Sequence, residues 1–332
     1  MTSTIRFVGR SRRETLKALA SLGLANALPA VAEPAFPNRP IMLMVPFAPA
    51  GVADIVARAV GEQMTASLGV AVVVDNKPSA GSIVASQAVA SAKPDGHTLL
   101  LMSNGNAVSV GLFKKLPYDT QKAFVPITTL GYFDLGIFVA ANSRFATLRD
   151  AIAFAKANPG KLNVATITPG STQHLAAKLF EMVAGIDMLV VPYRGSPAVL
   201  QAVRAGEVDL IFEIVAPMIP QLAAGAVRAL AVSSSQRNPA LPDVPTVQQA
   251  GVAGYDVSSW NALAAPAGTP PAVTERLGKA ARDALAAPAL RDKLGKLGMR
   301  VQASSPAELQ ALLGSEIKRW GEVIRKAGIE PE

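Results

Sequence analysis

Short apolar runs alternate along the chain with longer segments whose apolar residues recur every three or four positions. The apolar runs, which have the length of buried strands, are 70–74, 99–102, 162–167, 188–191 and 208–212. The segments between them have the periodicity of amphipathic helices. This alternation predicts an α/β fold in which mostly parallel strands are flanked by helices.

Local signals indicate where several helices begin and end. Thr147 and Ser305 each stand three residues before an acid, which is the spacing of a capping box. Ser171 or Thr172 can cap a helix that ends at Gly185. These signals place helices directly after strands, as an α/β fold requires.

The length of the chain, 332 residues, favours two domains over one. No internal repeat and no low-complexity linker separates two halves. We therefore expect two lobes joined by strands that cross between them. The candidate crossings are 135–140 and 257–264.

Residues 1–32 have the composition of an export signal. A basic region is followed by the short apolar stretch 18–28 and by the small-residue cleavage site Ala30-Val31-Ala32, so the mature chain would begin near Glu33. The pair Arg12-Arg13 resembles a twin-arginine signal, and the alternative is an ordinary secretory leader with two adjacent arginines. Either route predicts a soluble protein of the periplasm.

Export changes how the charge is interpreted. The chain has 32 Lys and Arg against 24 Asp and Glu, a net charge of +8. The leader through Ala32 holds five of the bases and one of the acids, so the mature chain carries +4. This weak charge gives no reason to expect nucleic acid as a partner. The absence of cysteine excludes disulfides and a thiol-linked lipid anchor.

Five apolar runs end in loops of small residues, most of which lead into helical patterns. Small side chains leave backbone N–H groups bare, and a helix N-terminus adds partial positive charge. Gathered in one cleft, such loops would hold a small anion without chemistry. The candidate residues are Phe47, Ala48, Ala50 and Gly51 in the first loop, Ser79, Ala80, Gly81 and Ser82 in the second, Ser103 and Asn104 in the third, Thr168, Gly170, Ser171 and Thr172 in the fourth, and Tyr193, Gly195 and Ser196 in the fifth.

Signals for catalysis are weak. The chain has two histidines, His97 and His174, and no thiol. A zinc site would need an unusual excess of carboxylates, and no nucleophile elbow, phosphate loop or dinucleotide fingerprint occurs. Ser171 and His174 could suggest a nucleophile and a base, but at a helix start Ser171 more readily caps and His174 more readily bonds locally. We expect no catalysis, no cofactor and no metal.

A series of short motifs, in order, resembles the Bug family, the solute receptors of tripartite tricarboxylate transporters. The motifs are Pro46-Phe47 with Gly51, Asp54 and Arg58; Asp75-Asn76-Lys77-Pro78; Pro94-Asp95-Gly96-His97-Thr98-Leu99-Leu100; Gly170-Ser171 with His174-Leu175-Ala176; Val191-Pro192-Tyr193-Arg194-Gly195-Ser196; Leu241-Pro242-Asp243-Val244-Pro245-Thr246; Trp260; and Ala265-Pro266-Ala267-Gly268-Thr269-Pro270. Each motif alone is weak, but eight in the family's order are specific.

The resemblance implies a two-lobed, flytrap-like periplasmic binding protein of type II, with lobe I formed by 33–137 and 256–332 and lobe II by 138–255. It implies a monomer that binds a small carboxylate, amino acid or aromatic acid through loop backbone and ordered waters. The partners would be integral-membrane permease subunits. Two alternatives stay open: a periplasmic enzyme of small organic acids, or a ligand sensor without a permease.

The chain departs from the family pattern in three places. Ala50 replaces the first of two glycines, Ser79 and Ser82 stand where glycines are usual, and Glu213 stands where Asp is common. Glu213 either helps to choose the ligand or serves the fold by capping a helix or pairing with an arginine.

Other residues also keep two interpretations. Phe47 either covers the ligand or belongs to the core, and Tyr193 either points into the cleft or packs against Pro192. Arg194 is either an anion clamp or a solvated side chain, and we favour the latter. Trp260 belongs to a hinge or core or stacks on the ligand. Asp54 is expected to stabilise a helix start and not to contact an anionic ligand.

Overall fold

The computed structural model describes residue 4 and residues 36–331. The chain from Pro37 onward forms one compact unit. The predicted leader and its cleavage site lie outside the described residues, except for Thr4. Within residues 36–331, none of the helices combines the length and the apolar composition that a membrane span requires.

Strands and helices alternate along most of the chain, as the hydrophobic pattern predicts. The strands are β1 (Ile41–Val45), β2 (Val72–Asn76), β3 (Thr98–Ser103), β4 (Phe124–Ala140), β5 (Leu162–Ile167), β6 (Met188–Tyr193), β7 (Leu210–Ile214), β8 (Val227–Val232), β9 (Ser258–Pro266) and β10 (Met299–Val301). The helices are α2 (Val52–Leu68), η1 (Ala80–Ser82), α3 (Ile83–Ala90), α4 (Asn104–Leu112), α5 (Leu148–Ala157), α6 (Thr172–Ala184), α7 (Ser196–Ala205), α8 (Val215–Ala223), α9 (Pro271–Ala286), α10 (Pro288–Lys296) and α11 (Pro306–Lys326).

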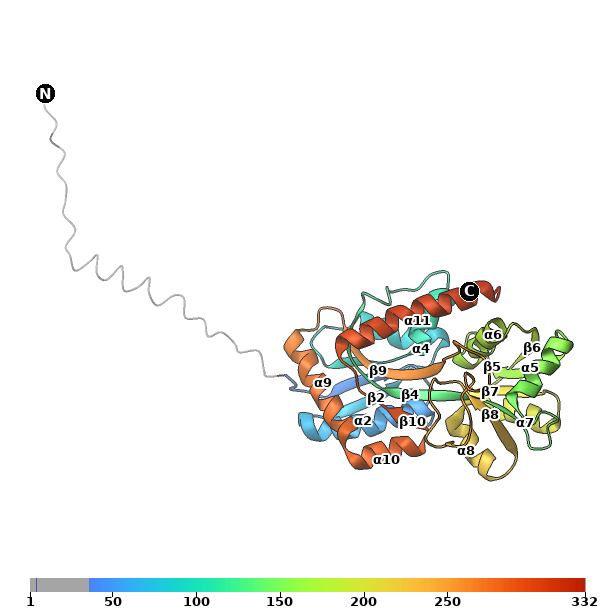
Figure 1. The fold of residues 1–332 in the computed structure, drawn as a ribbon. Helices are drawn as coiled ribbons and strands as arrows, with labels where there is room; N and C mark the ends of the chain where they lie inside the picture. The colour runs from blue at the N-terminus through green and yellow to red at the C-terminus, as the bar shows by residue number, and fades with distance from the viewer. Residues whose placement is uncertain (1–3, 5–35, 332) are drawn as a thin grey trace. The chain divides into compact units, whose positions relative to one another are not determined.

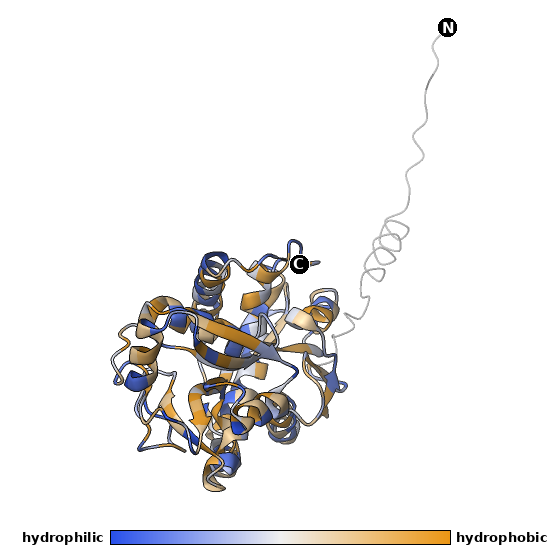
Figure 2. Cartoon of the chain, turned by 90° about the vertical axis from the view of Figure 1, so that its right-hand side faces the viewer, coloured by the Kyte–Doolittle hydropathy of each residue, from blue (hydrophilic) through white to orange (hydrophobic). Residues whose placement is uncertain are grey.

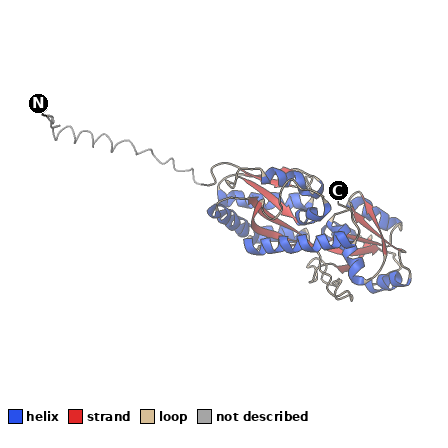
Figure 3. Cartoon of the chain, turned by 90° about the horizontal axis from the view of Figure 1, so that it is seen from above, coloured by secondary structure: helices blue, strands red, loops and turns tan. Residues whose placement is uncertain are grey.

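The main path through the strands has the order β2-β1-β3-β9-β4-β7-β5-β6, and β8 and β10 also pair with β4. β1 is parallel to β2 and β3, and β5 is parallel to β6 and β7. The strands that pair with β4 are antiparallel to it, so the sheet is mixed and the predicted parallel pairing holds for the two outer groups. Helices flank the strands of both groups (Figure 3).

The 17-residue strand β4 changes partners between Asp134 and Leu135. From Phe124 to Asp134 it pairs with β9, and near the end of this stretch also with β10. From Leu135 onward it pairs with β7 and β8. The predicted crossing at 135–140 is therefore the last third of a longer strand. β9 covers most of the other predicted crossing and runs beside β4 (Figure 1).

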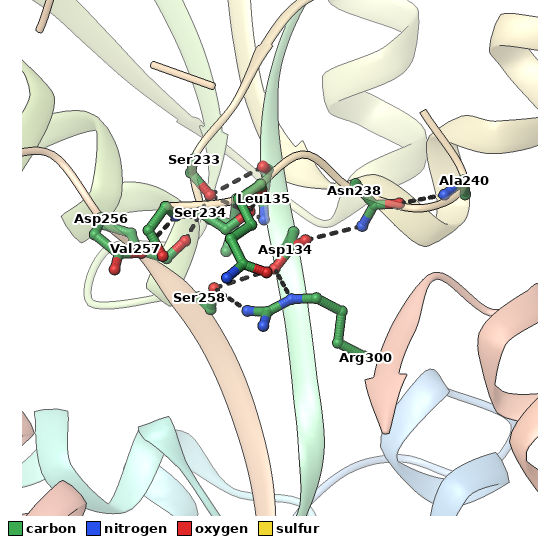
Figure 4. Close-up of polar contacts among 12 residues, drawn as sticks. Asp134, Leu135, Ser233, Ser234, Asn238, Ala240, Asp256, Val257, Ser258 and Arg300 are labelled. Atoms are coloured by element: carbon green, nitrogen blue, oxygen red, sulfur yellow. Dashed lines mark hydrogen bonds and ion pairs between the residues drawn. The ribbon is translucent and has the colours of Figure 1, made fainter. Parts of the chain in front are cut away.

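A buried carboxylate lies at this change of partners. The Asp134 side chain is fully buried and accepts hydrogen bonds from Asn238 Nδ2 at 2.9 Å, Ser258 Oγ at 3.1 Å and Arg300 Nε at 3.1 Å (Figure 4). These donors come from β9, from β10 and from the segment after β8. One carboxylate thus connects β4, β9 and β10 with the segment that follows β8.

Ser233 makes a second connection at the same place. Its hydroxyl accepts a hydrogen bond from Leu135 N–H at 3.1 Å and donates to the Val257 carbonyl at 2.6 Å (Figure 4). The Ser233 N–H donates to the Leu135 carbonyl at 2.8 Å. The two chain crossings are therefore tied to each other by buried polar contacts.

Predicted caps are present at the helix starts. Thr147 accepts from Asp150 N–H, and Ser305 accepts from Glu308 N–H, and both form complete capping boxes. The apolar faces of these helices pack on the strands, and Figure 2 shows hydrophobic strand segments enclosed by helices of mixed hydropathy. Local side-chain hydrogen bonds and an amphipathic face together fix these elements.

Candidate functional site

The predicted loops all lie where a strand ends and the next helix begins. They follow β1, β2, β3, β5 and β6 and precede α2, α3, α4, α6 and α7. Because β1, β2 and β3 are parallel, their carboxyl ends share one edge, and the same holds for β5, β6 and β7. The helix N-termini therefore gather in two groups, one on each side of the partner change in β4.

The first loop is organised by Asp54, as expected for a structural acid. The buried Asp54 carboxylate accepts from the Ala50 N–H at 2.9 Å and from Arg58 Nε at 3.0 Å. Asn76 Nδ2 also donates to Asp54 and to the Phe47 carbonyl. Burial opposes ionisation, but hydrogen bonds from Arg58, Asn76 and Ala50 outweigh it and lower the pKa of Asp54. All the hydrogen-bond donors to Asp54 thus come from the first loop, α2 and β2.

Side chains and backbone in the first loop remain accessible. Phe47 is 36% exposed, which excludes a place in the core and leaves the ligand-covering role as a proposal. Ala48, Ala50 and Gly51 are also exposed. Ala50 has φ +64°, a left-handed conformation that L residues rarely adopt. The backbone keeps a glycine geometry at a position where the family pattern expects glycine.

The second loop packs against the start of α4. Ser79 Oγ accepts from the Val84 N–H at 3.0 Å, and the carbonyl of Gly81 accepts from Ser109 Oγ. Ser82 is buried with φ +62°, and a side chain on Gly105 would approach Ser82 Oγ to 2.9 Å. The second and third loops are therefore in direct contact. Ala80 of the second loop is exposed to solvent.

The third and fourth loops meet across the two groups of strands. Ser103 caps α4, and the fully buried Asn104 donates through Nδ2 to Thr172 Oγ1 at 3.0 Å. Gly170 has φ +75°, and a Cβ there would lie 2.3 Å from Leu112 at the end of α4. Only glycine suits this close approach. The contact joins residues that are 68 positions apart in the chain.

The pair Ser171 and His174 is not arranged as a nucleophile and base. Ser171 Oγ accepts from the His174 backbone N–H at 3.1 Å, which caps α6, and Thr168 closes the turn through its carbonyl. The His174 ring accepts from the Gly170 N–H through Nδ1 at 3.4 Å. Burial, assisted by Lys178, lowers the pKa of His174. The prediction of a cap and a local hydrogen bond is confirmed.

The aromatic residue of the fifth loop, Tyr193, is partly buried, whereas Phe47 of the first loop is exposed. Tyr193 packs on the smaller hydrophobic cluster, and burial together with the nearby Glu207 carboxylate raises its pKa. Its hydroxyl is therefore placed toward Glu207. Gly195 is the N-cap of α7 at φ +87°, and Ser196 is the first residue of that helix. The Ser196 side chain lies near Glu213.

The apolar run 208–212 predicts that Glu213 follows its strand, but Glu213 is the fourth of the five residues of β7 and pairs in register with Gly136 of β4. Its side chain is 1% exposed. Gln173 Nε2 and the Ile214 N–H each donate to Oε1 at 2.8 Å. No arginine within the described residues pairs with it. Through its hydrogen bond with Gln173, Glu213 thus connects β7 with the first turn of α6.

Three supporting residues were not found from the sequence. Trp320 of α11 donates through Nε1 to Asn104 Oδ1 at 2.8 Å and fixes the orientation of that amide. Gln173 donates to Glu213, and the sequence signal for it was a polar side chain in the first turn of the helix that Ser171 caps. Asn261 of β9 faces Ser103 in register and leaves a buried Oδ1 without a partner in the described chain.

Exposure decides the alternative for Trp260. Trp260 is 1% exposed and belongs to the larger hydrophobic cluster, so it is a core residue. Arg194 is exposed beside its loop, which both interpretations allow, so the preference for a solvated side chain stays a prediction. Among residues 36–331, His, Asp and Glu form no group of three that could hold a metal ion. A hollow of about 560 Å³ beside α4 and α11, lined in part by Phe113 and Tyr118, shares no residue with the predicted loops.

Comparison with known proteins gives one consistent family. A sequence model described as the tripartite tricarboxylate transporter family receptor matches residues 56–329. A protein encoded in the tcbD-tcbE intergenic region of Pseudomonas sp. (strain P51) is 38% identical over 314 residues and covers 94% of both chains. The resemblance carried by the short motifs is therefore confirmed.

Solved structures agree with this assignment. The periplasmic binding protein BugD is 32% identical with a TM-score of 0.76, over 90% of this chain and 100% of that one. MatC from Rhodopseudomonas palustris, solved with malate, is 33% identical with a TM-score of 0.74, over 87% and 100%. An R. palustris protein solved with adipate is 30% identical with a TM-score of 0.78, over 90% and 100%. The predicted two-lobed binding-protein fold is confirmed.

Proposed function

Because the chain belongs to the receptor family of tripartite tricarboxylate transporters, we propose that it captures one small carboxylate per molecule and delivers it to membrane permease subunits. The observation that carries the proposal is the contact between loops from both groups of strands, at Asn104 with Thr172. That contact brings helix N-termini from both groups to one place. The relatives solved with malate and adipate support a carboxylate as the ligand.

The ligand site is formed by the strand-end loops. Phe47, Ala48, Ala50 and Gly51 are exposed in the first loop. The Ala50 N–H is already bonded to Asp54, so the anion would be bound by other N–H groups of the five loops. Three or four charge-assisted hydrogen bonds at roughly 1.5–3 kcal/mol each would support micromolar binding, about 8 kcal/mol, after the costs of association. No catalytic step is part of the proposal.

The lobes move about the change of partners in β4. Lobe I would comprise 33–137 and 256–332, and lobe II 138–255. The switch between Asp134 and Leu135 supports this division, because the strand pairs with different neighbours on either side. Saturating ligand is expected to reduce the radius of gyration in small-angle scattering, and an unchanged curve would contradict hinge closure.

The receptor works in the periplasm after removal of residues 1–32. The family and the BugD relative support this location, and the leader of the sequence supplies the export route. The mature protein acts as a monomer. Mass spectrometry of the periplasmic protein is expected to find a chain that begins near Glu33.

A calorimetric screen tests the function directly. The mature protein is titrated with C4 to C6 dicarboxylates, their monocarboxylate counterparts, amino acids, aromatic acids and cationic amines. We expect micromolar binding of at least one acid at one site per chain, and recovery of the acid unchanged after prolonged incubation. Binding of amines alone would contradict the receptor role, and turnover of the acid would favour the alternative of a periplasmic enzyme.

A further inference from the structure

Glu213 lies where the helix N-termini of the second group converge. It belongs to the end of β7, and its neighbours are Gln173 in the first turn of α6 and Ser196 at the start of α7. α6 has 13 residues and α7 has 10, so both present a full N-terminal turn. A side chain at this position is therefore adjacent to the fourth and fifth ligand loops.

The two oxygens of Glu213 have different surroundings. Oε1 accepts two hydrogen bonds of 2.8 Å, from Gln173 Nε2 and from the Ile214 N–H. Oε2 is buried and has no hydrogen-bond partner among the described residues, although the Ser196 side chain lies nearby. A carbonyl oxygen has two lone pairs, and both would be used at Oε1. This is the pattern of a neutral carboxylic acid whose Oε2–H still lacks an acceptor.

Among residues 36–331, no charged group is in contact with Glu213 to compensate its ionised form. Its contacts are with an amide, a hydroxyl and a backbone N–H. On α6 the nearest titratable side chain is His174, which bonds to Gly170, and Lys178 pairs with Glu181 further along the helix. The remaining charged groups on the packed elements, β4 and α7, are Asp134, which pairs with Arg300, and Arg204 in the last turn of α7.

Free energy therefore favours the protonated form. An isolated buried carboxylate is costly, and burial raises the pKa of Glu213 against the opposing effect of its hydrogen bonds. A protonated acid with an unpaired O–H is in turn satisfied by an acceptor oxygen from outside the chain. The adjacent ligand loops indicate where that oxygen comes from.

We propose that Glu213 donates its Oε2–H to an oxygen of the second polar group of the ligand, so that the receptor selects acids with an acceptor at both ends, such as dicarboxylates. The inference rests on the proposed function, because the loops hold the first carboxylate. It makes Glu213 a specificity-determining residue. An amine at the far end of the ligand would be disfavoured, because no negative charge meets it.

The test compares ligands that differ only at the second end. Succinate is paired with butyrate and adipate with hexanoate, and affinities are measured by calorimetry at pH 7. The variants are Glu213→Gln, which keeps a neutral donor, and Glu213→Leu, which removes it. The matched control is Glu62→Gln, an exposed glutamate on α2. Melting temperature and far-ultraviolet circular dichroism confirm that each variant is folded.

We expect the wild-type protein and Glu62→Gln to prefer a dicarboxylate over its partner by at least tenfold, the effect of one hydrogen bond to a charged group. Glu213→Gln should keep this preference within about threefold of the wild type, and Glu213→Leu should lose it. A tenfold gain in dicarboxylate affinity in Glu213→Gln would mean that the native side chain is ionised and repels the ligand, which overturns the inference. An unchanged preference in Glu213→Leu would overturn it as well.

An infrared difference spectrum of the wild-type protein provides a test that needs no folded Leu variant. A protonated-carboxyl band that shifts on addition of the dicarboxylate and is absent from Glu213→Gln supports the inference. The absence of such a band in the wild type contradicts it. If the wild type binds none of the acids, the proposed receptor function itself fails, which distinguishes the two outcomes.

Discussion

Replacing Asp134 by Asn tests how much the buried carboxylate stabilises the place where β4 changes partners. In the native protein this carboxylate is fully buried and accepts from Asn238, Ser258 and Arg300 at 2.9 to 3.1 Å. The Asn amide has nearly the same shape, but its NH2 group donates. Part of the network would then bring donor against donor at the point where β4 changes partners.

The size of the effect follows from the burial of each partner. Removing one side of a buried, hydrogen-bonded ion pair costs about 3–5 kcal/mol. The Arg300 side chain is 25% exposed and can recover some hydration, which lowers this value. Asn238 is 1% exposed and cannot, so its Nδ2 donor stays unpaired at about 1–3 kcal/mol. We therefore expect Asp134→Asn to lose about 3 kcal/mol of unfolding free energy.

Urea unfolding at pH 7, followed by the fluorescence of Trp260 and Trp320, measures this loss. Asp283→Asn is the control, because its exposed pair with Lys279 should be worth about 0–1 kcal/mol. A double-mutant cycle with Arg300→Met should give a coupling of about 1–3 kcal/mol. If Asp134→Asn loses no more stability than the control, the network does not hold the crossing together.

Three further changes test other parts of the chain. Ala50→Gly should raise the unfolding free energy by about 0.5–1 kcal/mol, because it relieves a positive φ. The control Ala48→Gly, at a residue whose φ is not positive, should lower the unfolding free energy by a similar amount. If both variants change the unfolding free energy in the same direction in urea, Ala50 is not strained. Burial lowers the pKa of His174 below its unfolded value of 6.5, so the unfolded chain binds more protons near and below that pH and stability falls as the pH falls. His174→Gln should therefore reduce the fall in melting temperature between pH 7 and pH 5. An unchanged fall would show that His174 does not cause the loss of stability in acid. Replacing Arg12 and Arg13 by Lys should abolish export if the twin-arginine route is used, and normal periplasmic yield would assign the general secretory route.

Elements with local hydrogen-bond signals were predictable from the sequence, and elements held by distant contacts were not. The caps at Thr147, Ser171 and Ser305 act within three residues, so the sequence alone reveals them. α4 begins with Asn104-Gly105-Asn106, which has low helix propensity. Its start is fixed by a local capping box in which the amide of Asn106 stands in place of an acid, and by Trp320, which binds Asn104 from 216 residues away. No local pattern encodes that contact.

The same distinction holds for the candidate site. The apolar runs predicted which loops follow strands, and the parallel pairing brings the ends of neighbouring strands to one edge. The contact between the two groups depends on individual side chains, such as Asn104 with Thr172, and on the bare Cα of Gly170 against Leu112. The length of β4 also escaped prediction, because Gly131 and Pro126 interrupt its apolar pattern while β9 follows it through two irregularities in register.

The strained positions in the first two loops indicate what these loops must preserve. Of the three places where glycine is usual, Ser79 has an extended φ of −161°, which any residue adopts, whereas Ala50 and Ser82 have positive φ. Each positive φ costs about 1–2 kcal/mol for an L residue and persists only where neighbouring contacts impose it. Asp54 imposes it at Ala50 by accepting that residue's N–H, and the packing of Ser82 against Gly105 imposes it in the second loop. The N–H of Ala50 is bonded to Asp54 and that of Ser82 to the Ser79 carbonyl, so the positive φ values set the path of the loops and do not expose these two N–H groups. The first two loops therefore retain a glycine-like backbone path although their side chains have changed, which supports the proposal that the loops bind the carboxylate and that Glu213 selects it.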